Sequence, residues 1–261
     1  MLKAFLFKRN CDAGPKNCLI AIRPKQLGKR LTPPGQAKHV EFADLIYDVS
    51  KLPGALGANG QTAPIGLQIG GGVRPIGTTV VFTQGTPEQT GVNTNMAING
   101  EGFFRVLLPD GNFGYTRDGT FVRDSTGQMV NGDGHILDPA VTIAPTAQEI
   151  AIAPTGEVSF QENGTSSQAG TIQLYRFANP AGLRQRGGNI YTATDASGPE
   201  QAGPPGSQGF GSLRQGHKEG SNVEVVGEMV SLITAQRAYE INSRAIRAGD
   251  EMLSNTSQIV R

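Results

Sequence analysis

Four acidic side chains in the middle of the chain are the residues best able to do chemistry. Asp118, Asp124, Asp133 and Asp138 are close enough in sequence for two of them to meet, and paired carboxylates serve as the acid and base of glycosidases. Each also stands beside a turn-forming residue, and Asp stabilises turns through hydrogen bonds to nearby backbone. We therefore expect turns. A secreted, β-rich glycan-binding or glycan-cleaving protein stays open as an alternative.

Other patterns that carry chemistry are incomplete. The stretch GGGVRPIG lacks the Lys-Ser/Thr pair of a phosphate-binding loop, and the chain has no Gly-x-Ser-x-Gly. Cys11 and Cys18 have no further thiols with which to complete a zinc site. No histidine has metal-ligand spacing to another; the histidines are His39, His135 and His217. We expect no enzyme activity, no cofactor and no metal site.

The charges are nearly balanced, with 23 Lys and Arg against 22 Asp and Glu. No field of one sign therefore exists to attract nucleic acid or an anionic membrane. No apolar run reaches the ~18 residues of a membrane-spanning helix, and charges interrupt the N-terminal MLKAFLFKRN too early for a secretory signal. We expect no nucleic-acid binding, no membrane insertion, and export by a route without a cleaved signal peptide.

Residues 95–199 have the pattern of a β-rich domain. Turn dipeptides follow one another closely, and the runs between them are short, such as FFRVLL and TFVR. Asn-Gly and Asp-Gly supply the positive φ of tight hairpins, which predicts a meander of short antiparallel strands. These dipeptides begin at Asn99, Asp110, Asp118, Asn131 and Asp133.

Three segments of different composition surround this domain. Residues 1–37 are basic and contain four prolines, which leave no room for a helix longer than about two turns. Residues 38–94 open with the amphipathic VEFADLIYDVSKL and continue as Gly-, Pro- and Thr-rich sequence, which predicts an extended β connecting domain. Residues 200–222 are again rich in Gly and Pro and return to that connecting domain.

Residues 223–261 predict one long helix. Ser221 or Asn222 could cap its start by accepting hydrogen bonds from free backbone N–H groups. Apolar residues recur every seven positions from Val225, and a second seam starts at Ala238. Other helices, from this chain or from copies of it, must bury this stripe. The predicted assembly residues are Val225, Met229, Leu232, Gln236, Arg237, Tyr239, Ile241, Ile246, Met252, Leu253, Ile259 and Val260.

This C-terminal segment resembles that of bacterial flagellar rod and hook proteins. Their pattern is Ser-Asn-Val, a Glu and apolar patch, and then Gln-Arg-Ala-Tyr-Glu, which fits SNVEVVGEMVSLITAQRAYE here. Further similar stretches are NMAINGEGFFRVLLPDGNFGYTRDGTFVRD, LYRFANPAGL and LRQG. The matching positions of the pattern are Ser221, Asn222, Val223, Met229, Gln236, Arg237, Ala238, Tyr239 and Glu240.

The resemblance implies a mixed α and β fold. In this family the long terminal helix pairs with an N-terminal helix as a coiled coil, and β-rich domains of short antiparallel strands face outward. Within the family, residues 38–94 are similar to the distal-rod subunit, with a rod-specific insert at about 46–74. Another flagellar axial subunit, of the proximal rod or the hook, remains the nearest alternative.

The resemblance also implies partners and a location. Subunits of this kind are expected to form a homo-oligomer, a helical tube that serves as the hollow drive shaft transmitting torque from motor to hook. The implied partners are the proximal rod proteins, the hook protein, the ring bushing proteins and the flagellar type III export apparatus. The implied location is the basal body, in the rod that spans the periplasm.

The first 37 residues depart from the family. Its members carry an inner-tube helix there with a hallmark such as NNLANVNTTGFK, whereas this chain is Pro-rich. Codons that encode residues 24–31 and 31–35 can be read in shifted frames as QNNWANV and NTTG, in the expected order. We hypothesise that residues 6–37 are a frame-shifted reading of the usual helix. The gene's nucleotide sequence tests this, because some other frame must restore an Asn-Asn-x-Ala-Asn-like segment.

Overall fold

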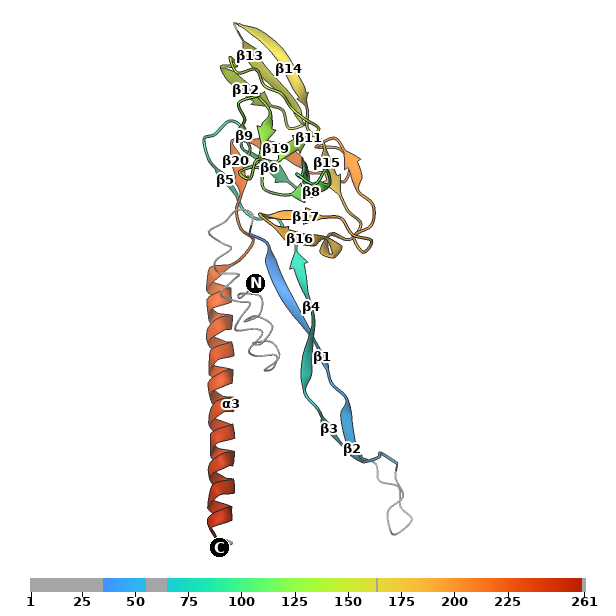
Figure 1. Cartoon of the computed structure of the whole chain (residues 1–261), viewed down its shortest axis with the longest axis vertical. Helices are drawn as coiled ribbons and strands as arrows, with labels where there is room; N and C mark the ends of the chain where they lie inside the picture. The colour runs from blue at the N-terminus through green and yellow to red at the C-terminus, as the bar shows by residue number, and fades with distance from the viewer. Residues whose placement is uncertain (1–34, 55–64, 163, 260–261) are drawn as a thin grey trace. The chain divides into compact units, whose positions relative to one another are not determined.

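The computed structural model describes residues 35–54, 65–162 and 164–259 (Figure 1). The two cysteines lie outside these residues, as does most of the segment with the proposed frame shift. The described chain divides into two units. We call residues 38–79 and 224–259 the ribbon–helix unit, and residues 35–37 and 80–223 the β unit.

The ribbon–helix unit contains two pairs of strands. Strand β1 pairs with β4, and β2 pairs with β3. The amide of Gly71 donates to the carbonyl of Ile46 at 3.1 Å in the bend between β3 and β4, so the Gly-rich stretch here is extended backbone. The strands are β1 (Ala37–Asp44), β2 (Tyr47–Lys51), β3 (Leu67–Gly70) and β4 (Val73–Val81).

The long helix forms as predicted but begins two residues later. Helix α3 (Val225–Ile259) has 35 residues, or roughly 50 Å at 1.5 Å per residue. The amide of Glu228 donates to the carbonyl of Glu224 at 3.0 Å, which closes the first turn. The prediction that Ser221 or Asn222 caps the helix is wrong, because both side chains bind segments far away in the sequence.

The β unit is built from short antiparallel strands, as predicted (Figure 1). Its first strands are β5 (Pro87–Gln89), β6 (Met96–Asn99), β7 (Phe104–Leu107), β8 (Phe113–Thr116), β9 (Val122–Arg123), β10 (Met129–Val130) and β11 (Ile136–Asp138). They are followed by β12 (Glu149–Ile152), β13 (Glu157–Glu162), β14 (Thr165–Thr171), β15 (Leu174–Arg176), β16 (Arg184–Gly187), β17 (Ile190–Thr192), β18 (Gln201–Gly203), β19 (Ser212–Gln215) and β20 (His217–Glu219).

The sheets of the β unit join distant parts of the chain. Among the described residues the largest has seven strands, in the order β16-β17-β8-β7-β11-β10-β9. A three-stranded sheet has the order β12-β13-β14, and β6 pairs with β19, β15 with β18, and β5 with β20. The chain that leads into the unit through β5 therefore lies beside the chain that leaves it through β20.

Turn formation accounts for three of the four aspartates. Oδ1 of Asp118 accepts a hydrogen bond from the amide of Thr120 at 3.1 Å. Asp138 is different, because it lies in β11 and its carboxylate accepts from Nε of Arg105 at 2.7 Å. The turn interpretation is wrong for this residue. The other two lie at turns between strands, and they are Asp124 and Asp133.

Two apolar clusters form the core of the β unit. The larger one is mainly aliphatic and includes Met96, Ile98, Phe104, Val106, Phe121, Met129, Leu137, Ile143, Ile172 and Leu174. The smaller one is mainly aromatic and consists of Phe103, Tyr115, Tyr175, Phe177, Leu183 and Tyr191, with Phe82 packed against it. The rings of Tyr115 and Phe177 meet edge to face, with centroids 4.7 Å apart, an arrangement that aromatic quadrupoles favour.

A buried ion pair connects the two ends of the β unit. Nε of Arg117 donates to Oε2 of Glu219 at 2.8 Å, and both side chains are almost fully buried. The remaining Arg117 nitrogens donate to the carbonyls of Gly102 at 3.3 Å and Gly100 at 3.1 Å. Oε1 of Glu219 accepts from the amide of Gly85 at 3.0 Å. These bonds offset the desolvation of two charges, which would otherwise cost several kcal/mol.

The aromatic cluster makes the stability of the β unit sensitive to alkali. Burial raises the pKa of Tyr191 to about 12, from its ordinary value of 10.0. Burial and a hydrogen bond to Glu200 also raise the pKa of Tyr115. The folded state thus favours the neutral phenols. The stability this contributes is complete below pH 10 and is lost as the pH rises through the folded pKa.

We expect the free energy of unfolding to fall between about pH 10 and 12, by roughly 2 kcal/mol from Tyr191 alone. Replacing Tyr191 with Phe removes the titrating group, so this variant should show a shallower fall over the same range. Urea unfolding of both proteins at a series of pH values measures the difference. Equal pH slopes would contradict the assignment of the effect to Tyr191.

Gln36 is a buried amide with one unmet hydrogen-bonding group. The residue is 99% buried and its Nε2 has no hydrogen-bond partner among the described residues, while Oε1 accepts from Nδ2 of Asn222 at 3.1 Å. A buried donor without an acceptor costs about 1–3 kcal/mol.

Replacing Gln36 with Leu should therefore stabilise the β unit, by about 1 kcal/mol. Asn222 retains the carbonyls of Val81 and Thr83 as acceptors for the two hydrogens of its amide, so the change leaves neither hydrogen without an acceptor. Urea unfolding measures the gain, and the same change at the exposed Gln168 is the matched control. A destabilised Gln36→Leu protein would show that the site requires the polar side chain.

Candidate assembly surfaces

The predicted assembly residues lie on α3, and most of their side chains are exposed. Val225 and Leu232 are half-buried. Ile259 ends the helix, and Val260 lies outside the described residues. The exposed members are Met229, Gln236, Arg237, Tyr239, Ile241, Ile246, Met252 and Leu253. Fully burying one such aliphatic side chain contributes about 1.5–3 kcal/mol, so an isolated copy leaves a large stabilising contribution unrealised.

The first turns of α3 carry a second apolar face that the heptad analysis missed. Val226, Val230 and Ile233 are exposed large apolar residues on this stretch. Together with Met229 they have the spacing i, i+3, i+4, i+7 that places side chains on one helical face. This spacing is visible in the sequence, but a heptad count that starts at Val225 does not include these positions. A helix that is apolar on most sides is usually covered on most sides.

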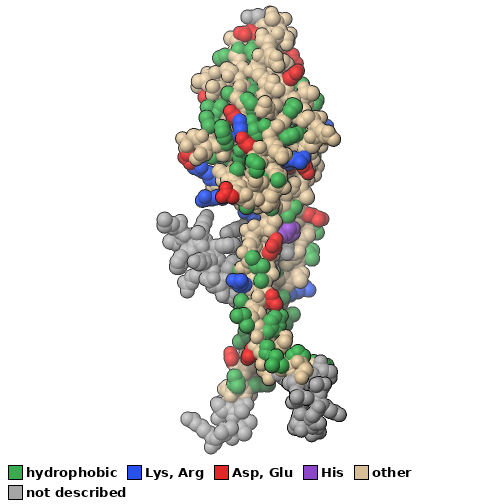
Figure 2. Space-filling model, turned by 90° about the vertical axis from the view of Figure 1, so that its right-hand side faces the viewer, with side chains coloured by type: hydrophobic (Ala, Val, Ile, Leu, Met, Phe, Trp, Pro, Cys, Tyr) green, Lys and Arg blue, Asp and Glu red, His purple; other side chains and the backbone are tan. Residues whose placement is uncertain are grey.

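The β2–β3 pair carries a second exposed apolar surface. Ile46, just before β2, is 90% exposed. Figure 2, a space-filling view, shows hydrophobic side chains in green on the surface that faces the viewer. A two-stranded ribbon has no layer of its own against which to bury such residues. The remaining exposed large apolar residues here are Tyr47, Val49, Leu52, Ile65, Leu67 and Ile69.

Both faces of this ribbon are apolar. Asp48 pairs with Ile69, and Val49 pairs with Gln68. Paired residues share a face and neighbours alternate, so Val49 and Ile69 lie on opposite faces. Strands with apolar residues on both faces are typical of sheets covered on both sides. The described part of the predicted insert, residues 46–54 and 65–74, therefore has the character of a buried element although its apolar residues are exposed in a single chain.

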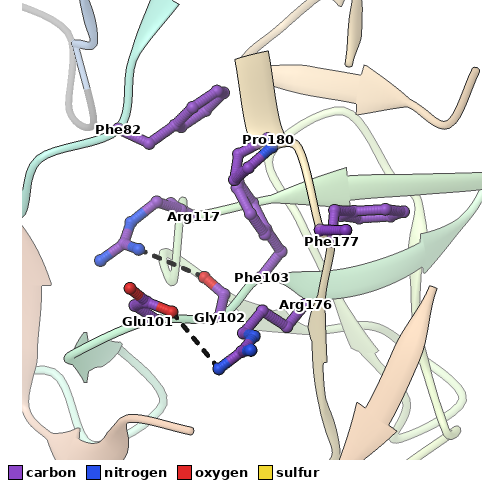
Figure 3. Close-up of a pocket in the computed structure, with 9 residues that line it drawn as sticks. Phe82, Glu101, Gly102, Phe103, Arg117, Arg176, Phe177 and Pro180 are labelled. Atoms are coloured by element: carbon purple, nitrogen blue, oxygen red, sulfur yellow. Dashed lines mark hydrogen bonds and ion pairs between the residues drawn. The ribbon is translucent and has the colours of Figure 1, made fainter. Parts of the chain in front are cut away.

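The β unit contains a small cavity beside its aromatic cluster (Figure 3). Its volume is about 210 Å³, and its lining residues are Phe82, Glu101, Gly102, Phe103, Arg117, Arg176, Phe177, Ala178 and Pro180. Arg117 is already bound to Glu219, and Arg176 faces Glu101 at 3.6 Å. No hydroxyl, thiol or imidazole is found among these described lining residues. The cavity thus lacks a nucleophile with a neighbouring base.

The described residues offer no other chemical centre. Over these residues no group of three or more His, Cys, Asp or Glu could hold a metal ion. His217, for example, places Nδ1 2.8 Å from the carbonyl of Gln215, within its own turn. No helix in the same part of the chain is long and apolar enough to cross a membrane. The exposed apolar surfaces of α3 and of the β2–β3 ribbon remain the features that most need a partner.

Comparison with family models shows two matches. Residues 97–160 match the flagellar hook protein FlgE/F/G D1 domain. Residues 214–259 match the flagellar basal body rod FlgEFG protein C-terminal domain. The first lies within the β unit, and the second covers the last half of β19, all of β20 and α3.

Comparison with curated proteins shows relatives along most of the chain, each described as flagellar basal-body rod protein FlgG. The protein of Buchnera aphidicola subsp. Schizaphis graminum is 42% identical over 220 residues, 84% of this chain and 85% of that protein. The Caulobacter vibrioides protein is 40% identical over 225 residues, 85% of this chain and 86% of that protein. The Bacillus subtilis protein is 34% identical over 229 residues, 85% of this chain and 86% of that protein.

Proposed function

Since this chain belongs to the family of the flagellar basal-body rod protein FlgG, we propose that its subunits polymerise through α3 and the β2–β3 ribbon into the tube of the distal rod. The chain is a structural, non-enzymatic protein of cell motility and a subunit of the distal rod. The observation that carries the proposed mode of assembly is the apolar surface that both elements leave exposed.

The exposed surface of α3 supports a tube in which helices pack on one another. The apolar column of Val225, Leu232, Tyr239, Ile246 and Leu253 repeats every seven residues, the spacing at which helices supercoil. A 35-residue helix that no partner covers is marginal in water. Copies of α3, and the N-terminal helix expected of the family, are the proposed cover. Residues 223–261 would then form the inner tube, with residues 95–199 outside it.

The β2–β3 ribbon supports a distal-rod position within the tube. Its two apolar faces suit insertion between neighbouring subunits, which would stiffen a straight shaft. The insert at about 46–74 is the segment expected to separate this subunit from the proximal rod and hook subunits. A glycan-binding protein, by contrast, would be expected to expose several aromatic side chains beside polar groups, whereas Tyr47 is the one aromatic among the exposed large apolar residues described on this ribbon.

The family places the chain among other proteins of the hook–basal body complex. A Bacillus subtilis relative, 29% identical over 231 residues, is described as flagellar hook-basal body complex protein FlhP. We propose the proximal rod proteins, the hook protein and the ring bushing proteins as direct neighbours, and the type III apparatus as the export route. In this arrangement the rod crosses the periplasm and transmits torque to the hook.

Replacing Ile246 with Asp tests the role of α3. Ile246 is exposed in one chain, so the variant should fold normally. A carboxylate buried without a partner in a helix seam costs several kcal/mol, so polymer formation should fall at least about tenfold. Sedimentation over a range of protein concentrations measures polymer, and the matched control is Arg244→Gln, which makes the same change in net charge at an exposed residue on the other side of the helix. Unchanged polymerisation of Ile246→Asp would rule out this seam.

Replacing Ile69 with Lys tests the role of the ribbon. Ile69 is more than half exposed, so the free energy of unfolding of the monomer should change by less than about 0.5 kcal/mol. Polymer formation should fall, because a Lys ammonium would enter an apolar interface. The control is Thr78→Lys on β4. Electron microscopy of the polymer and swimming assays of a strain complemented with each variant measure the effect. Normal straight rods with Ile69→Lys would leave the ribbon without a role in assembly.

A further inference from the structure

One side chain, that of Asn222, bonds two other stretches of chain, so that three stretches meet at it. Its Oδ1 accepts a hydrogen bond from the amide of Ala37 at 2.7 Å. Its Nδ2 lies 2.9 Å from the carbonyl oxygen of Val81 and 3.0 Å from that of Thr83. Further acceptors around Nδ2 are Oγ1 of Thr83 at 2.9 Å and Oε1 of Gln36 at 3.1 Å. Only a side-chain amide supplies both the acceptor and the donors that this position uses.

The neighbouring residues strengthen this junction. Oγ of Ser221 donates to the carbonyl of Gly35 at 2.8 Å, and the amide of Asn222 donates to the same carbonyl at 3.2 Å. Oγ of Ser221 also accepts from the amide of Val223 at 3.2 Å. We call this set of contacts, among residues 35–37, 81–83 and 221–223, the Asn222 knot.

The knot lies next to the points where the chain passes between its two units. Within the described residues these passages follow residues 37, 79 and 223. The knot lies on the β-unit side of all three. Strand β1 begins at Ala37, β4 ends at Val81 and α3 begins at Val225. The three connections between the units, after residues 37, 79 and 223, are therefore all held by the same set of hydrogen bonds.

We propose that Asn222 is a positioning residue that couples these three connections, so that displacing one of them breaks the hydrogen bonds of all. The coupling itself stands on contacts within the β unit. Its mechanical consequence rests on the proposed function: in a rod subunit, twist carried by α3 would be shared with both ribbon strands instead of acting on the single backbone connection near residue 223.

Hydrogen–deuterium exchange of the full chain, resolved to single amides, tests the coupling. In the Asn222→Ala variant the amide of Ala37 loses its acceptor directly, whereas the amide of residue 222 still has the carbonyl of Gly35. Coupling predicts that both amides exchange at least about tenfold faster. Acceleration at Ala37 alone would show that Asn222 is only a local cap. The amide of Gly85, which binds Glu219, is the internal reference and should not change.

Two further variants keep the test decisive. Asn222→Asp removes the donors and keeps an acceptor, so it should accelerate both amides as well, whereas Asn112→Asp at an exposed turn should accelerate neither. If Asn222→Ala unfolds the β unit, Asn222→Asp decides the test, because it keeps an acceptor for the amide of Ala37 and should still accelerate the amides of residues 37 and 222. No acceleration there overturns the coupling. Because exchange requires no rod, its failure is separate from a failure of the polymerisation tests.

Discussion

The buried ion pair between Arg117 and Glu219 is the interaction on which the rest of the β unit depends. It joins the end of β8 to β20, and through the amide of Gly85 it also holds the chain that leads into the unit. Two charges in an apolar interior are tolerable only when every donor and acceptor is satisfied. The bond from Gly85 to Glu219 joins the incoming chain to the outgoing chain, next to residues 81–83 and 221–223, which Asn222 links.

The close approach of these two chains also explains a glycine. A Cβ on Gly85 would lie 2.0 Å from the carbonyl oxygen of Gly220, a distance that no side chain can occupy. The backbone therefore passes where only Gly permits it. The ion pair, the glycine contact and the Asn222 knot act in the same small region, and each constrains the same pair of chain ends.

The two units differ in how much of their apolar surface they bury. The β unit buries its own aliphatic and aromatic clusters, so it has the core of an independent domain. The ribbon–helix unit leaves Ile46, Ile69, Ile246 and Leu253 exposed. Folding draws on the buried surfaces of the β unit, and the proposed assembly would draw on the exposed surfaces of the ribbon–helix unit. A chain built in this way can be stable as a monomer and still gain free energy from polymerisation.

The sequence by itself determined the local features: the hairpin turns, the short strands, the long helix and its heptad column. Each depends on residues within a few positions of one another, and the family motifs add the function. Only the tertiary structure decided the roles of Asp138, Ser221, Asn222 and Glu219. Their partners lie 33 to 186 positions away, where no local pattern reaches. Ser221 or Asn222 was predicted to cap the helix beside them, but in the folded chain the Oδ1 of Asn222 that would accept from the helix accepts from the distant amide of Ala37 instead.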